Sequence, residues 1–297
     1  MLRRKAFNRI FISTLVFFVI IILYSINKVS NNVEHDIFNG NSYIYSLNND
    51  NYVSKASIYV SKNISIEEKI KQKLNAIIED NNKNVLLPSY INPIIPKNTK
   101  VEKVLINDGI VKVYFSKELL NISDIWSEKM IESIIYTITD ENILGVEIYV
   151  DGSILKYVPN TNKKIKGTLT RDFGINKVYE VVSVSDIVKV VMNYYGKDGN
   201  NYYSIPVTKY VNSNKEKLEI IIDEYNSFND LISFVDNISL LDYKFKDNTL
   251  IINLVSNDLN NFDELFDSLF DNYDVDKIII YNDNQKKVEK NRKDIEN

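Results

Sequence analysis

The sequence contains no cysteine and a single histidine, His35. The absence of cysteine excludes disulfide bonds, thiol catalysis, cysteine-based zinc sites and lipid attached through cysteine. A lone histidine cannot supply the paired-histidine motifs of zinc enzymes. His35 lies in a polar stretch just after a hydrophobic segment, where nothing holds it against a nucleophile as a catalytic triad requires. We therefore expect no catalytic residue, no metal site and no cofactor.

Glycine and proline are also scarce, with eight and five residues. The glycines are scattered, so neither a GxGxxG nor a GxxxxGK phosphate-binding loop is present. Paired carboxylates of the kind that glycoside hydrolases use occur at Glu67-Glu68, Asp140-Glu141 and Asp263-Glu264. Each pair lies at the end or on the polar face of a predicted helix, where acidic residues are expected without any catalytic role. The sequence therefore predicts that the chain is not an enzyme.

Basic residues are few after residue 28. The whole chain has 36 Lys and Arg against 40 Asp and Glu, but residues 1–28 hold five basic residues and no acidic one. The rest of the chain therefore carries a formal net charge of −9. Such a surface does not attract nucleic acid, anionic lipid or anionic wall polymers over a distance. We expect no nucleic-acid partner.

The N-terminal region contains a long uncharged run, residues 10–27, which is apolar on all sides. A helix of this length spans about 27 Å, close to the ~30 Å of a hydrocarbon core. Four basic residues precede the run, so the positive-inside rule places residues 1–9 in the cytoplasm. We predict a single-pass transmembrane anchor in the cell membrane, then a polar stalk over residues 28–41, then extracytoplasmic domains.

A cleaved signal peptide is the alternative interpretation of this segment. Its hydrophobic region would be shorter, and small residues would follow it at a cleavage site. The sequence after the run is YSINKVSNN, which contains no such pair of small residues. We therefore expect an uncleaved anchor.

Residues 42–158 contain a first set of secondary-structure patterns. Ser65 and Glu68 form a capping box that begins an amphipathic helix, and Asp108-Gly109 suits the tight turn of a hairpin. In chain order, the patterns predict strands at 42–47 and 51–60, a helix from 65 to 78, a hairpin over 101–115, a helix over 124–139 and a strand at 145–150.

Residues 178–285 repeat this order of elements. The patterns predict a hairpin over 187–211, a helix over 214–225, a hairpin over 240–256, a helix over 261–273 and a strand at 277–281. The last helix carries Phe262 and Leu265 on an apolar face and Asp263 and Glu264 on a polar face. We therefore predict two tandem domains, joined by a polar linker at 159–177 and followed by a disordered tail at 286–297.

These patterns carry a resemblance to a known family. The residues IPKNTKV at 95–101, DGIVKVYFS at 108–116 and VEIYVDG at 146–152 resemble the GerMN domain, also called the sporulation and spore germination domain. In the second copy, residues 194–209 are similar to the opening hairpin of the family. The resemblance covers most of residues 42–285.

The resemblance implies an α+β fold of two tandem small domains, each a mixed β-sheet packed by two helices, after the N-terminal transmembrane helix. It also implies an extracytoplasmic location, no catalysis and a relation to ring-forming modules of sporulation secretion complexes. Typical members are lipoproteins anchored through a cysteine, so the hydrophobic run is expected to replace that anchor here. Polar residues at 79–84 and 226–227 replace the Gly-Pro that often ends the first helix of the family.

The family pattern also identifies turn residues. They are Pro96, Asp108, Gly109, Asp151 and Gly152. We interpret them as structural, because glycine accepts a positive φ and aspartate bonds to the backbone that follows it.

We predict an interaction surface at two places. Strands 146–150 and 278–281 close the two repeats and are candidates for free edges, and tyrosines gather around the turn near residue 199. The candidate surface residues are Ile148, Tyr149, Tyr194, Tyr195, Tyr202 and Tyr203. For the four tyrosines around the turn, burial in the core is the favoured alternative.

We therefore expect a non-catalytic scaffold or assembly protein of the bacterial envelope, acting in sporulation or spore germination. Its partners would be other envelope proteins, ring-forming modules among them. One alternative stays open: a module that binds peptidoglycan and supports or regulates a wall-remodelling enzyme.

Overall fold

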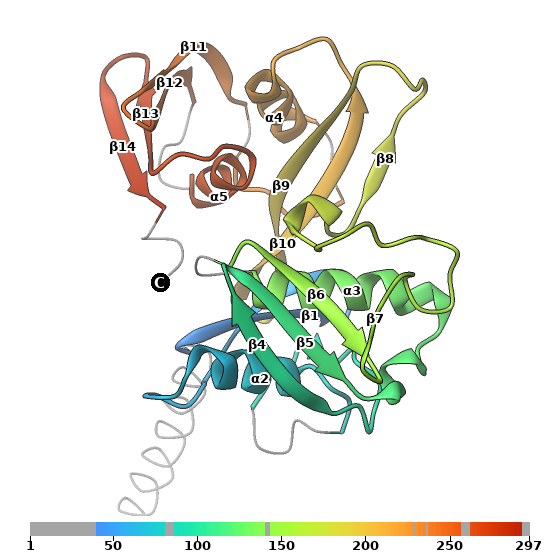
Figure 1. Ribbon diagram of the computed structural model, residues 1–297. Coiled ribbons are helices and arrows are strands. Elements are labelled where there is room, and N and C mark those ends of the chain that lie inside the picture. The colour runs from blue at the N-terminus through green and yellow to red at the C-terminus, as the bar shows by residue number, and fades with distance from the viewer. Residues whose placement is uncertain are drawn as a thin grey trace, which may run out of the picture.

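The structure is a computed structural model that describes residues 40–80, 86–139, 143–227, 230–235, 237–256 and 262–292. The predicted cytoplasmic segment, the membrane anchor, the stalk up to residue 39, His35 and the Asp140-Glu141 pair lie outside this range. In the described part of the chain, no helix is long and apolar enough to cross a membrane. The chain forms two lobes, one from each half of the sequence (Figure 1).

The first lobe is a domain with two sheets. Its elements are β1 (Ser42–Asn48), β2 (Val53–Ile58), α2 (Ile66–Ala76), β3 (Ile91–Asn92), β4 (Val101–Asn107), β5 (Ile110–Phe115), the 3-10 helix η2 (Lys117–Leu120), α3 (Asp124–Ile138), β6 (Gly145–Val150) and β7 (Ser153–Ile154). One sheet is antiparallel with strand order β2-β1-β3, and the other is mixed with order β4-β5-β6-β7. Helix α3 contacts β1 and β6, and α2 contacts β1 and β4, so both helices lie between the sheets.

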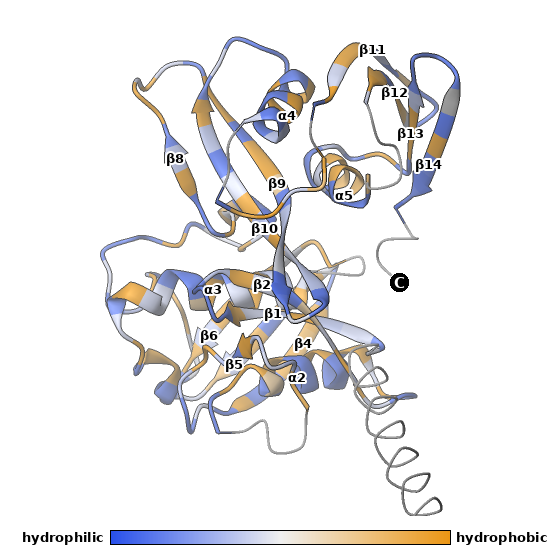
Figure 2. Ribbon diagram, turned by 180° about the vertical axis from the view of Figure 1, so that it is seen from behind, coloured by the Kyte–Doolittle hydropathy of each residue, from blue (hydrophilic) through white to orange (hydrophobic). Residues whose placement is uncertain are grey.

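The second lobe repeats this architecture. Its elements, with the 3-10 helix that precedes them, are η3 (Arg171–Phe173), β8 (Val178–Glu180), β9 (Ile187–Asp198), β10 (Asn201–Asn212), α4 (Lys217–Asn226), β11 (Ser239–Lys246), β12 (Thr249–Val255), α5 (Asp263–Asn272), β13 (Lys277–Asn282) and β14 (Lys286–Asn291). The sheets have orders β8-β10-β9 and β11-β12-β13-β14. Figures 1 and 2 show α4 and α5 between them.

Corresponding contacts show that the two domains are copies of one unit. The pairs β5–β6 and β12–β13 are both parallel within their mixed sheets. The hydroxyl of Thr137 on α3 accepts a hydrogen bond from the N–H of Tyr45 at 2.9 Å. At the equivalent place, the hydroxyl of Ser268 on α5 accepts from the N–H of Asn193 at 2.8 Å. The predicted tandem repeat is confirmed.

The helices are buried because each lies between the two sheets of its domain. Ser65 begins α2 as predicted, accepting a hydrogen bond from the N–H of Glu68 at 3.2 Å. Helix α3 buries every residue from Met130 to Ile138, because a sheet or helix covers each of its sides.

On α5 the prediction that Glu264 faces solvent is wrong. Its carboxylate is buried and caps the loop at 233–235, accepting from the backbone N–H of Val235 at 2.7 Å.

The prediction of one sheet per domain is wrong. In each copy the helices pack on the opening hairpin and separate it from the remaining strands.

The prediction of a disordered tail is also wrong for residues 286–291. They form β14, which pairs with β13 from Lys277↔Asn291 to Asn282↔Lys286. Its lysines and its glutamate suit a strand at the edge of a sheet.

Neither of the two strands predicted to be free edges is at an edge. Strand β6 lies between β5 and β7, and Val146 exchanges two backbone hydrogen bonds with Leu169, at 2.7 and 2.8 Å. Strand β13 lies between β12 and β14. In both copies the chain folds back after the strand and covers it, which a pattern of single strands cannot reveal.

Candidate functional site

The predicted linker, residues 159–177, packs against both domains. Leu169 and Ile175 are buried in the core. Near its end, the N–H of Ile175 donates to the hydroxyl of Thr208 on β10 at 2.9 Å, and the N–H of Thr208 donates to the C=O of Ile175 at 2.8 Å. The linker is therefore part of a junction between the domains rather than a free tether.

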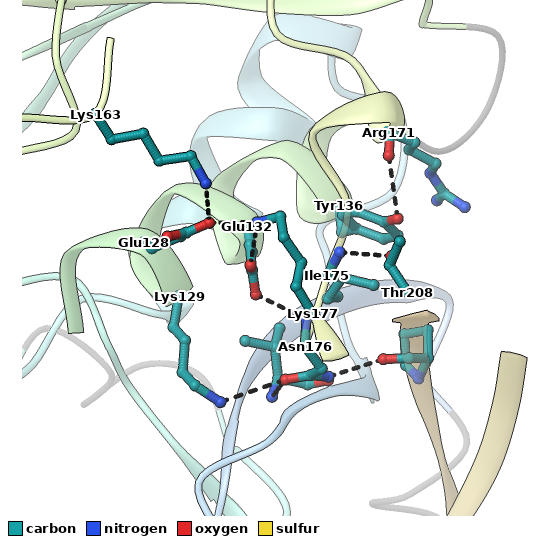
Figure 3. A network of polar contacts seen from close by, with 12 residues as sticks. Glu128, Lys129, Glu132, Tyr136, Lys163, Arg171, Ile175, Asn176, Lys177 and Thr208 are labelled. Atoms are coloured by element: carbon teal, nitrogen blue, oxygen red, sulfur yellow. Dashed lines mark hydrogen bonds and ion pairs between the residues drawn. The ribbon is translucent and has the colours of Figure 1, made fainter. Parts of the chain in front are cut away.

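Asn176 occupies the centre of this junction (Figure 3). Its side-chain amide accepts a hydrogen bond from the N–H of Val53 at 2.8 Å and donates to the C=O of Val53 at 2.7 Å. The same amide donates to the C=O of Pro206 at 2.8 Å. Val53 begins β2, an edge strand of the first domain, and Pro206 lies on β10 of the second. One buried side chain thus joins the two domains.

Lys177 follows Asn176 and forms ion pairs with α3. Its Nζ lies 2.6 Å from Oε1 of Glu132 and 2.6 Å from Oε1 of Glu128. Glu132 is only 2% exposed, and its other oxygen accepts the backbone N–H of Asn176 at 2.9 Å. Burial raises the pKa of Glu132, and Lys177 opposes that rise. The carboxylate is tolerated because Lys177 and the Asn176 N–H replace its lost hydration.

Arg171 adds contacts between the end of α3 and helix α5 of the second domain. The hydroxyl of Tyr136 donates to the Arg171 carbonyl at 3.4 Å (Figure 3). The guanidinium donates to Thr139, at the C-terminal end of α3, at 3.2 Å and lies 3.4 Å from Asp271 on α5. Side chains from α3, the linker and α5 therefore meet in one continuous polar network.

The hairpin of β9 and β10 makes a second contact between the domains. Figure 2 shows it from behind, reaching from the second lobe to the first. The ring of Tyr203 stacks on Tyr90, with centroids 3.9 Å apart, and its hydroxyl accepts from Asn48 at 3.2 Å. Gly196 permits this arrangement, because a Cβ there would lie 2.4 Å from the Tyr203 ring. Ser89 donates to Asp198 near the tip, at 2.5 Å.

The residues that match the family pattern occupy turns. Asp108 and Gly109 join β4 to β5 with φ of 48° and 75°, and Asp151 and Gly152 join β6 to β7 with 49° and 76°. A positive φ at both central residues is typical of a type I′ hairpin turn. Pro96 is buried, and its carbonyl accepts from the hydroxyl of Thr99 at 2.6 Å.

The structure does not gather the predicted interaction residues on one surface. Ile148, Tyr194 and Tyr203 are buried and so are not available for contact. For the two tyrosines this agrees with the alternative of burial in the core. Tyr149 is half-buried and stacks on Tyr114. Tyr195 and Tyr202 remain near the surface, where they form an aromatic cluster with Phe234, with centroid separations of 5.0 to 6.3 Å.

Neither composition nor periodicity distinguishes the residues of the junction. Asn176 and Lys177 lie in a polar stretch that is typical of a linker, and Glu132 lies among apolar residues in the C-terminal half of α3. The position of Glu132 could have predicted a buried ion pair, because a charge among buried apolar residues requires a partner. Within the described ranges, no three His, Cys, Asp or Glu side chains form a group that could hold a metal ion.

Comparisons with known proteins agree with this architecture. The model of the family described as sporulation and spore germination (Germane) matches residues 43–156. The spore germination protein GerM of Bacillus subtilis (strain 168) is 26% identical over 186 residues, which is 61% of this chain and 50% of that protein. This chain therefore spans about half the length of that relative.

A solved structure extends the likeness to both domains. It is that of the tandem GerMN domains of the sporulation protein GerM from Bacillus subtilis, with a TM-score of 0.69 and 22% identity, covering 80% of this chain and 89% of that one. A match at this identity establishes the fold. Residues 43–156 therefore match the GerMN domain family, and the fold of the chain is that of two GerMN domains in tandem.

Proposed function

We propose that this chain is a non-catalytic scaffold of the bacterial envelope that acts in sporulation or spore germination. Residues 10–27 anchor it in the cell membrane, and the two domains lie outside the cytoplasm. It works by contacts with other envelope proteins. The family of the first domain and the tandem fold support this reading.

The observation that carries the proposal is the junction at Asn176 and Lys177. Hydrogen bonds and ion pairs to both domains hold them in one orientation. A flexible tether would let each domain bind its partner independently. A fixed junction instead presents the surfaces of both domains in a set geometry, as an assembly component requires.

Exposed apolar side chains provide contact surfaces on the second domain. Val182 and Val184 are 96% and 98% exposed in the loop after β8. Asn212 holds this loop, accepting from the N–H of Val182 at 2.7 Å and donating to the C=O of Ser185 at 2.6 Å. Tyr202 is 46% exposed at the aromatic cluster. Apolar groups displayed on an ordered surface are typical of protein interaction sites.

Site-specific crosslinking in cells tests the proposal. A photoreactive residue at Val184 or Tyr202 of the full-length chain is expected to capture envelope proteins, and one at exposed Glu68 serves as the control position. Asn176→Gly is expected to weaken capture while each domain stays folded by circular dichroism. Equal capture at all three positions would contradict a specific docking surface.

A second measurement separates a scaffold from an enzyme. Alanine at any single exposed aspartate or glutamate, for example Asp263, is expected to leave cellular function intact. Loss of function with fold and partner capture unchanged would favour catalysis and overturn the scaffold proposal.

A further inference from the structure

The first domain has a surface hollow with an apolar floor and a polar rim. Its volume is about 340 Å³. Ile94 and Pro96 contribute to the floor, and the indole of Trp126 at the start of α3 lines it. Asn98 and Asn121 stand at its rim. Ligand sites of roughly 300–1,000 Å³ share this plan, and a hollow at the small end of that range holds a group about the size of one ring.

Four successive residues beside the hollow, 93–96, have no free backbone N–H to offer an extended peptide. Pro93 and Pro96 have no N–H. The N–H groups of Ile94 and Ile95 both donate to the C=O of Ile77, at 3.1 and 2.9 Å. A peptide that adds a strand needs free backbone donors and acceptors. Recognition in this hollow therefore depends on side chains.

The side chains of the rim are polar and unengaged. Among the residues that the structure describes, Asn98 and Asn121 have no hydrogen-bond partner for their amides. Each amide offers two donors and an acceptor. Lys97 and Glu79, also at the rim, carry opposite charges and form no ion pair in the described part of the chain. The rim has no net charge, so it suits a neutral ligand rich in hydroxyl or amide groups.

We propose that this hollow binds one N-acetylated sugar ring of a neutral glycan. The indole of Trp126 packs against the apolar face of the ring, because a pyranose has C–H groups on one face and hydroxyls at its edge. The amides of Asn98 and Asn121 bond to the hydroxyl and acetamido groups. This inference goes beyond the scaffold function, and neither depends on the other.

Trp126 reports directly on the hollow, because the chain contains a single tryptophan. The full-length chain in detergent is titrated with the tetramer of β-1,4-linked N-acetylglucosamine while tryptophan emission is recorded. A saturable change in emission is expected. The β-1,4-linked glucose tetramer, which lacks the acetamido groups, is expected to bind more weakly. No saturable change with the acetylated tetramer, or a change only with a proline-containing peptide, would overturn the proposal.

Variants that retain the tryptophan locate the site. Asn98→Gly and Asn121→Ala are each expected to weaken binding by roughly two- to ten-fold, the effect of one lost hydrogen bond. Glycine is chosen at Asn98 because its φ is 65°. Asn63→Gly is the matched control, since Asn63 is exposed, has a φ of 61° and lies outside the hollow. Unchanged affinity in the double variant of Asn98 and Asn121 would also overturn the proposal.

Discussion

The side-chain amide of Asn176 pairs with both the N–H and the C=O of Val53, at 2.8 and 2.7 Å. It imitates the backbone of a neighbouring strand and completes the edge of β2. Its second N–H reaches the carbonyl of Pro206 on β10. Because these two strands belong to different domains, a single side chain bonds to both sides of the junction.

The first prediction is that Asn176→Gly uncouples the domains. The change leaves the buried N–H and C=O of Val53 and the C=O of Pro206 without their partner, at about 1–3 kcal/mol for each unsatisfied group, so a loss of at least about 3 kcal/mol is expected. In the parent chain, denaturant unfolding followed by Trp126 emission and by circular dichroism should coincide. In the variant the two transitions should separate.

Asn176→Ala serves as the companion variant. Asn176 has a φ of 45°, so alanine adds a backbone cost of about 1–2 kcal/mol that glycine does not. Coincident transitions in both variants, with losses near zero, would show that other contacts determine the junction.

The second prediction concerns the ion pair between Lys177 and Glu132. Lys177→Met should destabilise the chain by about 3–5 kcal/mol at neutral pH, because it leaves the Glu132 carboxylate buried without its partner. Adding Glu132→Gln should recover most of that loss, since glutamine still accepts the N–H of Asn176. Chemical denaturation of both variants at pH 7 measures the effect. A double variant as unstable as the single one would contradict this account.

The elements that could be predicted from sequence are those with local causes. Helix α2 begins at the Ser65 capping box, and the hairpin of β4 and β5 turns at Asp108 and Gly109, both with positive φ. Hydrophobic periodicity placed α3 and α5 within one or two residues of their observed ends. The order of elements therefore follows from short-range patterns, and so does the repeat.

The features that were missed depend on long-range contacts. Asn176 and Val53 are 123 residues apart in sequence, and nothing near Asn176 indicates its partner. Strand β14 resembles a charged tail because four of its six residues are charged, and only its pairing with β13 makes it a strand. The contact between Tyr203 and Tyr90 forms only when the hairpin reaches the first domain in the folded chain, so no local pattern could reveal it.

The third prediction uses the close approach of Gly196 to Tyr203. Gly196→Ala should displace the Tyr203 ring from Tyr90 and cost about 1–3 kcal/mol, as overpacking does. If the cost arises from this contact, adding Gly196→Ala to Tyr203→Ala should cost little more, which a double-mutant cycle measures. Asn201→Ala, at an exposed position of the same hairpin, is the control for a general effect of alanine. Additive losses would mean that the Tyr203 ring is not what Gly196 accommodates.

The last prediction concerns Asp267 on α5. Burial raises its pKa from 3.8 to about 6, with Lys55 of the first domain opposing the shift and Asp271 adding to it. Between these values the folded chain holds a proton that the unfolded chain has lost, so this group lowers stability as the pH rises from about 4 to about 6. Asp267→Asn should remove that loss, giving equal stability near pH 3.5 and a gain of about 1–2 kcal/mol at pH 7, less than the full pKa difference implies because the side chain is partly exposed. Asp263→Asn changes the charge equally at an exposed position of the same helix and should shift stability by only about 0.5 kcal/mol. Denaturant unfolding from pH 3.5 to 8 measures both. A destabilised Asp267→Asn at pH 7 would show that attraction to Lys55 outweighs burial, and would place another contact across the domain junction.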